Sequence, residues 1–110
     1  NYMKLIDVTN NYSELVMQQL ENTDAYFIKV YTIGNTTVIY TEAEEHIEIV
    51  LINKKRNVKN NEVREILRNL IDQAAKITEF DVIYLDNIVE ISIPVKKIAK
   101  KLSERRELLQ

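Results

Sequence analysis

Apolar and polar residues follow two periods along this chain, one typical of helices and one typical of strands. The helical period, with apolar residues at i, i+3, i+4 and i+7, occurs in the runs NNYSELVMQQLEN and NNEVREILRNLIDQAA. Asn11, followed three residues later by Glu14, resembles a capping box, and Asn60 or Asn61 is expected to cap the second helix. The predicted apolar stripes are Tyr12, Leu15, Val16, Gln19 and Leu20, then Val63, Ile66, Leu67, Leu70, Ile71 and Ala74.

A hairpin is predicted over 25–41, where Gly34-Asn35 separates two β-branched runs. A type II′ turn needs a positive φ at its first central residue, and glycine adopts that value without steric cost. The turn predicts the pairs Ile33–Thr36, Thr32–Thr37, Tyr31–Val38, Val30–Ile39 and Lys29–Tyr40. Both faces of this hairpin are largely apolar, so we expect both to be covered.

Four further strands follow from alternation with a period of two. KLIDV (4–8) predicts a short first strand, and 44–52 predicts a strand with its odd-numbered residues on one face. A second hairpin is expected over 82–94, turning at Asp86-Asn87 and ending at Pro94, which has no N–H to donate. Residues 82–85 are apolar on both faces, which favours helices on both sides of the sheet.

A third, basic helix is predicted after Pro94. The helix carries six basic residues. Its apolar positions form a narrow stripe, interrupted by Arg105 and Arg106, that consists of Val95, Ile98, Ala99, Leu102 and Leu109. Two interpretations stay open, a helix that packs on the sheet with a solvated basic face and a frayed end, and a helix that projects towards an acidic partner. An acidic partner could be the N-terminal half of a second copy of the chain.

These elements predict a single α/β domain with the order βαββ-βαββ-α. We expect a mixed, largely antiparallel sheet of five or six strands with helices on both faces, a three-layer αβα arrangement. Residues 1–94 form the α/β core domain, and 95–110 form the C-terminal basic amphipathic helix of the same domain. The first two helices superpose at an offset of 51 residues, so an internal duplication is one hypothesis, against a chance match of two amphipathic helices.

Composition narrows the class of protein. The chain of 110 residues has no cysteine, which excludes disulfides and thiolate chemistry and makes the reducing cytoplasm the expected location. Its aliphatic runs are too short to span a membrane. The net charge of −2 hides a segregation, with −6 over 1–53, +4 over 54–76, −4 over 77–94 and +4 over 95–110.

The single histidine, His46, lies two residues from Glu48 on one face of a predicted strand. Zinc takes three or four ligands, so this pair does not make a metal site, and no nucleophile is placed beside it for catalysis. One glycine in the chain also excludes the glycine-rich loops that bind phosphates. We therefore interpret His46 and Glu48 as a solvated strand end and expect no catalytic residue, metal or cofactor.

The basic loop, defined as Lys54, Lys55, Arg56 and Lys59, is the remaining candidate site. It follows a strand and precedes a helix, where free N–H groups and the helix dipole favour anions. The alternative is an ordinary solvated loop. Together with the C-terminal helix, the loop could also contact nucleic acid, although the sequence carries no recognised nucleic-acid-binding motif.

The runs MKLIDVTNNYSELV and VYTIGNTTVIYTEAEEHIEIVLIN resemble a small family of uncharacterised proteins from low-GC Gram-positive, lactic-type bacteria. The likeness covers most of the chain up to about Pro94. It implies a domain of unknown function with a three-layer αβα arrangement, and it supplies no catalytic residue, ligand or partner.

The sequence thus favours a small cytosolic protein-interaction or regulatory module without catalytic activity. Its partner is expected to be a protein, including a second copy of this chain as a homodimer, and no membrane is expected. The alternative is a module that binds anions, nucleotides or nucleic acid weakly through the basic loop and the C-terminal helix.

Overall fold

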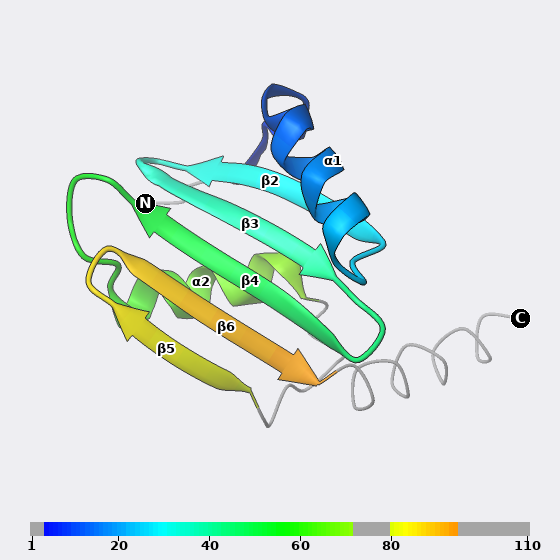
Figure 1. Cartoon of the computed structure of the whole chain (residues 1–110). Helices are drawn as coiled ribbons and strands as arrows, with labels where there is room; N and C mark the ends of the chain where they lie inside the picture. Colours follow the sequence, from blue (N-terminus) through cyan, green and yellow to red (C-terminus); the bar gives the residue numbers. More distant parts are fainter. Residues whose placement is uncertain (1–3, 72–79, 95–110) are drawn as a thin grey trace, which may run out of the picture.

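The structure is a computed structural model that describes residues 4–71 and 80–94. It is a compact α/β domain in which six strands form one sheet in the order β1-β2-β3-β4-β6-β5, accompanied by two α-helices (Figure 1). The strands are β1 (Ile6–Asp7), β2 (Phe27–Ile33), β3 (Thr36–Glu42), β4 (His46–Asn53), β5 (Asp81–Leu85) and β6 (Ile88–Pro94). The helices are the 3-10 turn η1 (Thr9–Tyr12), α1 (Ser13–Asn22) and α2 (Asn60–Leu70).

Every pairing between neighbouring strands is antiparallel, so the expectation of a mixed sheet was wrong for the described residues. Each hairpin connection is short. The segment that contains α2 connects β4 to β5, which lies at the edge of the sheet, and β6 then lies between β5 and β4. The first strand is also shorter than predicted. It pairs only Ile6 with Thr32 and Asp7 with Tyr31 before the chain turns into η1.

The first hairpin has the predicted register, with Ile33 opposite Thr36 and Val30 opposite Ile39. Gly34 adopts φ = 57°, as the first central position of a type II′ turn requires. Asp86 adopts φ = 52° at the corresponding position of the second hairpin, which also turns where predicted. Aspartate tolerates this left-handed conformation better than most residues, although less well than glycine.

The core lies between one face of the sheet and α2. Odd-numbered residues of β4 are buried there, and Val63 and Ile66 of α2 pack against them. The fully buried side chains of this core include Val38, Ile49, Leu51, Ile66, Val89, Ile91 and Ile93. The predicted parity of β4 is therefore confirmed, and so is the predicted stripe of the second helix as far as Ile71. Ala74 lies outside the described residues.

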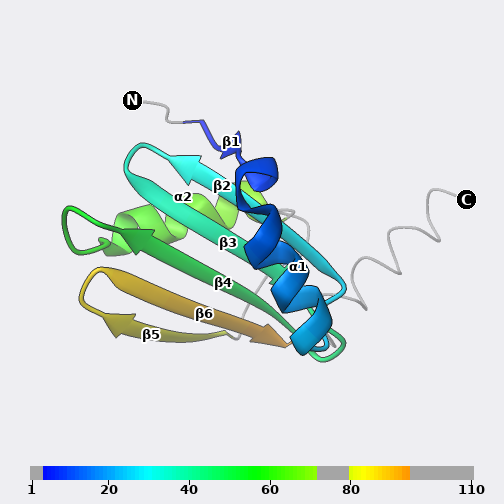
Figure 2. The same cartoon turned by 45° about the horizontal axis from the view of Figure 1, so that its top comes forward.

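Helix α1 lies on the other side of the sheet, beside β2 and β3, and contributes no buried residue (Figure 2). Over this side of β5, Ile83 and Leu85 are about half exposed, at 53% and 52%. The expected cover over both faces of 82–85 is thus missing among the described residues. The full three-layer arrangement stays a prediction. The predicted helix over 95–110 lies outside the described residues, as does the predicted end of the second helix.

Two predicted caps were wrong. The chain enters α1 through η1, so Tyr12 is the N-cap residue of α1 and no side chain caps this helix. Just before η1, the Asp7 carboxylate accepts hydrogen bonds from Thr9 N (2.9 Å) and Thr9 Oγ1 (2.6 Å). These bonds lower the pKa of Asp7. Asn60 is already the first residue of α2, and the side chain of Glu62 reaches back to the N–H of Lys59 (3.2 Å).

The proposed duplication also stays a prediction, but the two halves pair differently. In the first half, β1 pairs with β2, the next strand along the chain, whereas β4 pairs with β6 and not with β5. No described helix is long and apolar enough to cross a membrane.

The two turns lead to a paired prediction. Gly34→Ala should lower the free energy of unfolding by about 1–2 kcal/mol, because a Cβ is unfavourable at positive φ. Asp86→Gly, at almost the same φ, should either raise the free energy of unfolding or lower it by no more than about 0.5 kcal/mol. Urea unfolding followed by circular dichroism measures both variants. A Gly34→Ala variant as stable as the unmodified chain would contradict this account of the turn.

Candidate functional site

The basic loop begins where β4 ends, at the buried residue Asn53, which is 0% exposed. The Asn53 side chain donates to Thr36 Oγ1 of β3 (3.1 Å) and accepts from the backbone N–H groups of Lys55 (2.9 Å) and Arg56 (3.2 Å). One buried amide therefore joins two strands and sets the direction in which the loop leaves the sheet. No buried polar side-chain atom of the described residues lacks a hydrogen-bond partner.

Glu62 closes this loop from the other side. Its carboxylate accepts two hydrogen bonds from the Arg56 guanidinium, one of them at 3.0 Å from Nη2, and a further one from Thr36 Oγ1 (3.4 Å). The bond to Arg56 is the main cause that lowers the pKa of Glu62, and the same bond raises the pKa of Arg56. Asn53, Thr36, Glu62 and Arg56 thus form one hydrogen-bonded chain from β3 to the start of α2.

The four predicted site residues consequently have different surroundings. Arg56 is half exposed but paired with Glu62, whereas Lys54, Lys55 and Lys59 are exposed and form no ion pair with any described residue. The Glu62 carboxylate occupies the N-terminal turn of α2, where an external anion was expected. Whether the loop binds an anion stays a prediction.

Sequence reasoning missed Asn53, Thr36 and Glu62 as members of this site. Glu62 lies three residues after Lys59, the spacing of a capping carboxylate, and this signal could have identified it. Asn53 ends an apolar strand and offered a weaker signal, since an asparagine there usually starts a turn. Thr36 could not have been found, because its contact with α2 joins residues 26 positions apart.

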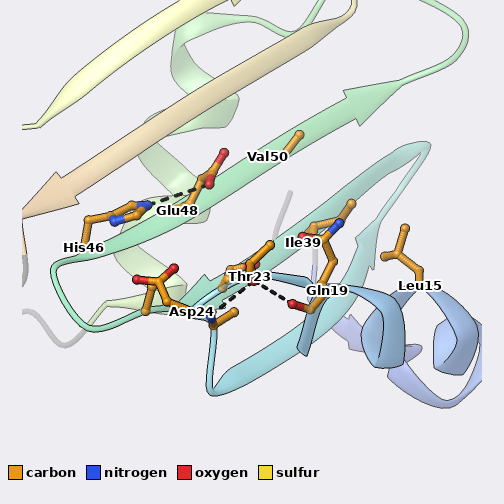
Figure 3. Close-up of a pocket in the computed structure, with 11 residues that line it drawn as sticks. Leu15, Gln19, Thr23, Asp24, Ile39, His46, Glu48 and Val50 are labelled. Carbon is orange, nitrogen blue, oxygen red and sulfur yellow. Dashed lines mark hydrogen bonds and ion pairs between the residues drawn. The ribbon is translucent and has the colours of Figure 1, made fainter. Parts of the chain in front are cut away.

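His46 and Glu48 lie at the opposite end of β4, on the side of the sheet that faces α1. Their side chains are about half exposed, with His46 Nε2 and Glu48 Oε2 3.9 Å apart. They form part of a hollow of about 340 Å³ between α1 and the sheet (Figure 3). Its other lining residues include Leu15, Gln19, Thr23, Asp24, Ile39 and Val50.

A second hollow of about 180 Å³ adjoins the first, because His46 and Glu48 line both. The rest of its lining comes from β5 and β6 and consists of Asp81, Ile83, Glu90, Ile91 and Ser92. Three carboxylates around one histidine make this surface acidic, yet no group of three or more potential ligands among the described residues is placed to hold a metal ion. The strand end is solvent-exposed, as predicted, but it borders a groove that the sequence did not reveal.

The fold and these two surfaces define a small α/β domain with a six-stranded antiparallel sheet and open polar surfaces at both ends of β4. The chain belongs to the DUF1827 family, a domain of unknown function, which matches residues 3–94. The resemblance inferred from the sequence and its extent to Pro94 are confirmed.

A crystal structure of a conserved protein of unknown function from Streptococcus thermophilus is similar to this chain, with 39% sequence identity and a TM-score of 0.73. The similarity covers 84% of this chain and 97% of that chain. No curated protein matches the sequence. Family and structural relative both leave the function open, and neither indicates catalysis or a specific ligand.

The pair of Glu62 with Arg56 gives a prediction about pH. Because the pKa of Glu62 is lowered in the folded state below its ordinary 4.5, the pair contributes stability above that pH and loses it as the pH falls through the folded pKa. Glu62→Gln should therefore cost about 1 kcal/mol at pH 7 and progressively less below about pH 4.5. Urea unfolding of both proteins between pH 3 and pH 7 measures the difference.

Glu65→Gln is the matched control, because Glu65 is exposed on the same helix and its carboxylate has no hydrogen-bond partner among the described residues. It should leave the pH dependence of stability unchanged. A Glu62→Gln variant whose stability follows that of the unmodified chain at every pH would show that the pair contributes nothing.

Proposed function

We propose that this domain is a protein-interaction module without catalytic activity and that it binds a second copy of the same chain through strand β5. The observation that carries the proposal is the composition of this edge strand. Ile83, Tyr84 and Leu85 are each more than half exposed, on both faces of the sheet. No described element lies beyond β5 (Figure 1).

Edge strands of monomeric proteins usually carry features that prevent pairing with other chains, such as lysines, prolines or bulges. β5 has none of these, and it pairs with β6 residue by residue without interruption. The other edge, β1, is only two residues long and leads directly into η1. β5 is therefore the edge suited to pairing with another strand.

The sequence of β5 also complements itself. Two antiparallel copies related by a two-fold axis at Ile83 place this residue opposite the partner's Ile83, and Val82 opposite the partner's Tyr84. Asp81 then lies opposite the partner's Leu85, so no like charges meet across the interface. Apolar cross-strand pairs on both faces would bury side chains that are exposed in the single chain.

We place this module in the cytoplasm, in the absence of cysteine, and assign it no cofactor. The proposal includes a three-layer αβα arrangement for the complete chain. Its support is the position of α1 and α2 on opposite sides of the sheet (Figures 1 and 2), together with the predicted helix over 95–110.

Self-pairing through β5 predicts a dimer with twice the chain mass of 12.9 kDa in light scattering or sedimentation equilibrium. Ile83→Lys should convert it to the monomer, because it would place two lysines opposite each other at the two-fold axis. Mixing Ile83→Lys with Ile83→Glu should restore a dimer, since opposite charges then meet. Amide signals of 81–85 should change together with the mass.

Met17→Lys is the control, because Met17 is also exposed (59%) but lies on α1, away from the proposed interface. Its variant should remain a dimer. An unmodified chain that stays at 12.9 kDa at millimolar concentration, or a dimer that survives Ile83→Lys, would exclude pairing through β5.

A second candidate function is weak anion binding by the basic loop. The observation that favours it is the exposure of Lys54, Lys55 and Lys59 around the start of α2 without an ion pair to any described residue. Arg56 would contribute less, because Glu62 already neutralises it. Each exposed charge contributes little to the free energy of binding, so the affinity for the anion should be low and should fall as the salt concentration rises.

Titration of inorganic phosphate at low salt should shift the backbone amide signals of 54–62 and few others. Lys54→Gln combined with Lys55→Gln should remove most of these shifts, whereas Lys29→Gln, at a lysine paired with Asp7, should not. Shifts centred on His46 and Glu48, or none at all, would contradict anion binding at the loop. Binding to generic DNA that weakens steeply with salt would favour nucleic acid as the anion.

A further inference from the structure

The side of the sheet that carries α1 is only partly covered. Neighbouring strands lie about 4.8 Å apart, so six strands span about 24 Å, whereas a helix with its side chains is about 10 Å wide. α1 is the one described helix on this side, and it lies near β2 and β3 (Figure 2). The part of this side over β4, β6 and β5 therefore has room for one more helix beside α1.

This uncovered part has a distinct composition at each end. The register aligns Glu48, Ser92 and Asp81 in one row across the three strands, and the next row is Val50, Glu90 and Ile83. The third row is Ile52, Ile88 and Leu85. We name these nine residues the open face. It is acidic near Pro94 and apolar at its far end.

The chain leaves the sheet at the acidic end of the open face. Pro94 is the last residue of β6 and pairs with His46, next to the two hollows that Glu48 lines. The following segment, 95–110, carries six basic and two acidic residues. Its net charge is positive, whereas Glu48, Glu90 and Asp81 of the open face are negative. Asp24, on the loop after α1, adds a further negative charge beside the first hollow.

The length and the apolar spacing of 95–110 also match the open face. As a helix, sixteen residues extend about 24 Å. The strand from Pro94 back to Ile88, which includes the three rows, extends about 20 Å. Val95, Ile98, Ala99 and Leu102 form one stripe, with Lys96, Lys97, Lys100 and Lys101 around it. Lys96 and Lys101 flank this stripe and would reach the carboxylates from its two edges, whereas Lys97 and Lys100 would face solvent. Arg106 and Leu109 share the face of the stripe and would lie over the apolar row.

We propose that residues 95–110 form a basic amphipathic helix that docks in cis on the open face, beside α1 and antiparallel to β6. The segment lies outside the part of the chain that the family matches, residues 3–94, so the helix would be an addition to the family domain. Its role is to cover the apolar row and to neutralise the acidic groove. The docked helix would also cover Ile83 and Leu85, so pairing through β5 would then use the outer backbone edge of the strand and the exposed Tyr84 on its other face.

The absence of cysteine allows a clean test in the full-length chain. Glu104 lies opposite the apolar stripe, so a nitroxide attached to Glu104→Cys would not block docking. Amide signals of β5, β6 and the sheet-facing residues of α1, such as Gln19, should lose most of their intensity. Signals of α2, on the other side of the sheet, should keep theirs.

Reversing the charge of the groove supplies a second measurement. Glu48→Lys combined with Glu90→Lys should restore the intensity of the β5 and β6 signals, because the lysines of the segment are then repelled. Glu44→Lys combined with Glu45→Lys changes the charge equally at two exposed residues outside the open face and should leave the signal loss unchanged.

Three outcomes would overturn the proposal. Weak, uniform broadening would mean that the segment projects into solvent, and broadening confined to α2 would place it on the other side of the sheet. A trans arrangement is tested by mixing spin-labelled chain with ¹⁵N-enriched chain that carries no nitroxide. Strong broadening of β5 and β6 in that mixture would mean that a second copy supplies the helix.

Discussion

The structure depends on the burial of alternate side chains of β4 against α2. Ile47, Ile49 and Leu51 point to the same face and are almost completely buried, with β3 on one side of the strand and β6 on the other. A shift of the register by one residue would move all three to the side of α1 and bring polar residues into the core. The positions of both neighbouring strands and of α2 follow from this one constraint.

The end of β4 shows how a polar contact completes such a core. Asn53 continues the buried parity of the strand, and its amide is satisfied by Thr36 and by the backbone of the loop. Glu62 then brings the start of α2 against the same threonine and binds Arg56. The basic loop is consequently a structural connection as well as a charged surface, and its three exposed lysines are the part that remains for a ligand.

The two sides of the sheet differ in how far they are covered, and this difference bears on function. The side of α2 is closed by apolar packing, whereas the side of α1 exposes apolar residues over β5 and a groove with acidic residues beside His46. Exposed apolar residues on a strand are a feature of surfaces that bind other protein segments. The exposure of these strand residues is a property of the tertiary structure, and the sequence pattern did not reveal it.

By itself, the sequence determined what local periodicity and turn chemistry control. Gly34 set the first hairpin and its register, and the spacing of Val63 and Ile66 set the buried face of α2. Only the tertiary structure decided that β4 pairs with β6 and not with β5, that Glu62 turns back to Arg56, and that α1 leaves part of its side of the sheet open. These features join residues far apart in the chain, so the pattern around any one residue does not contain them.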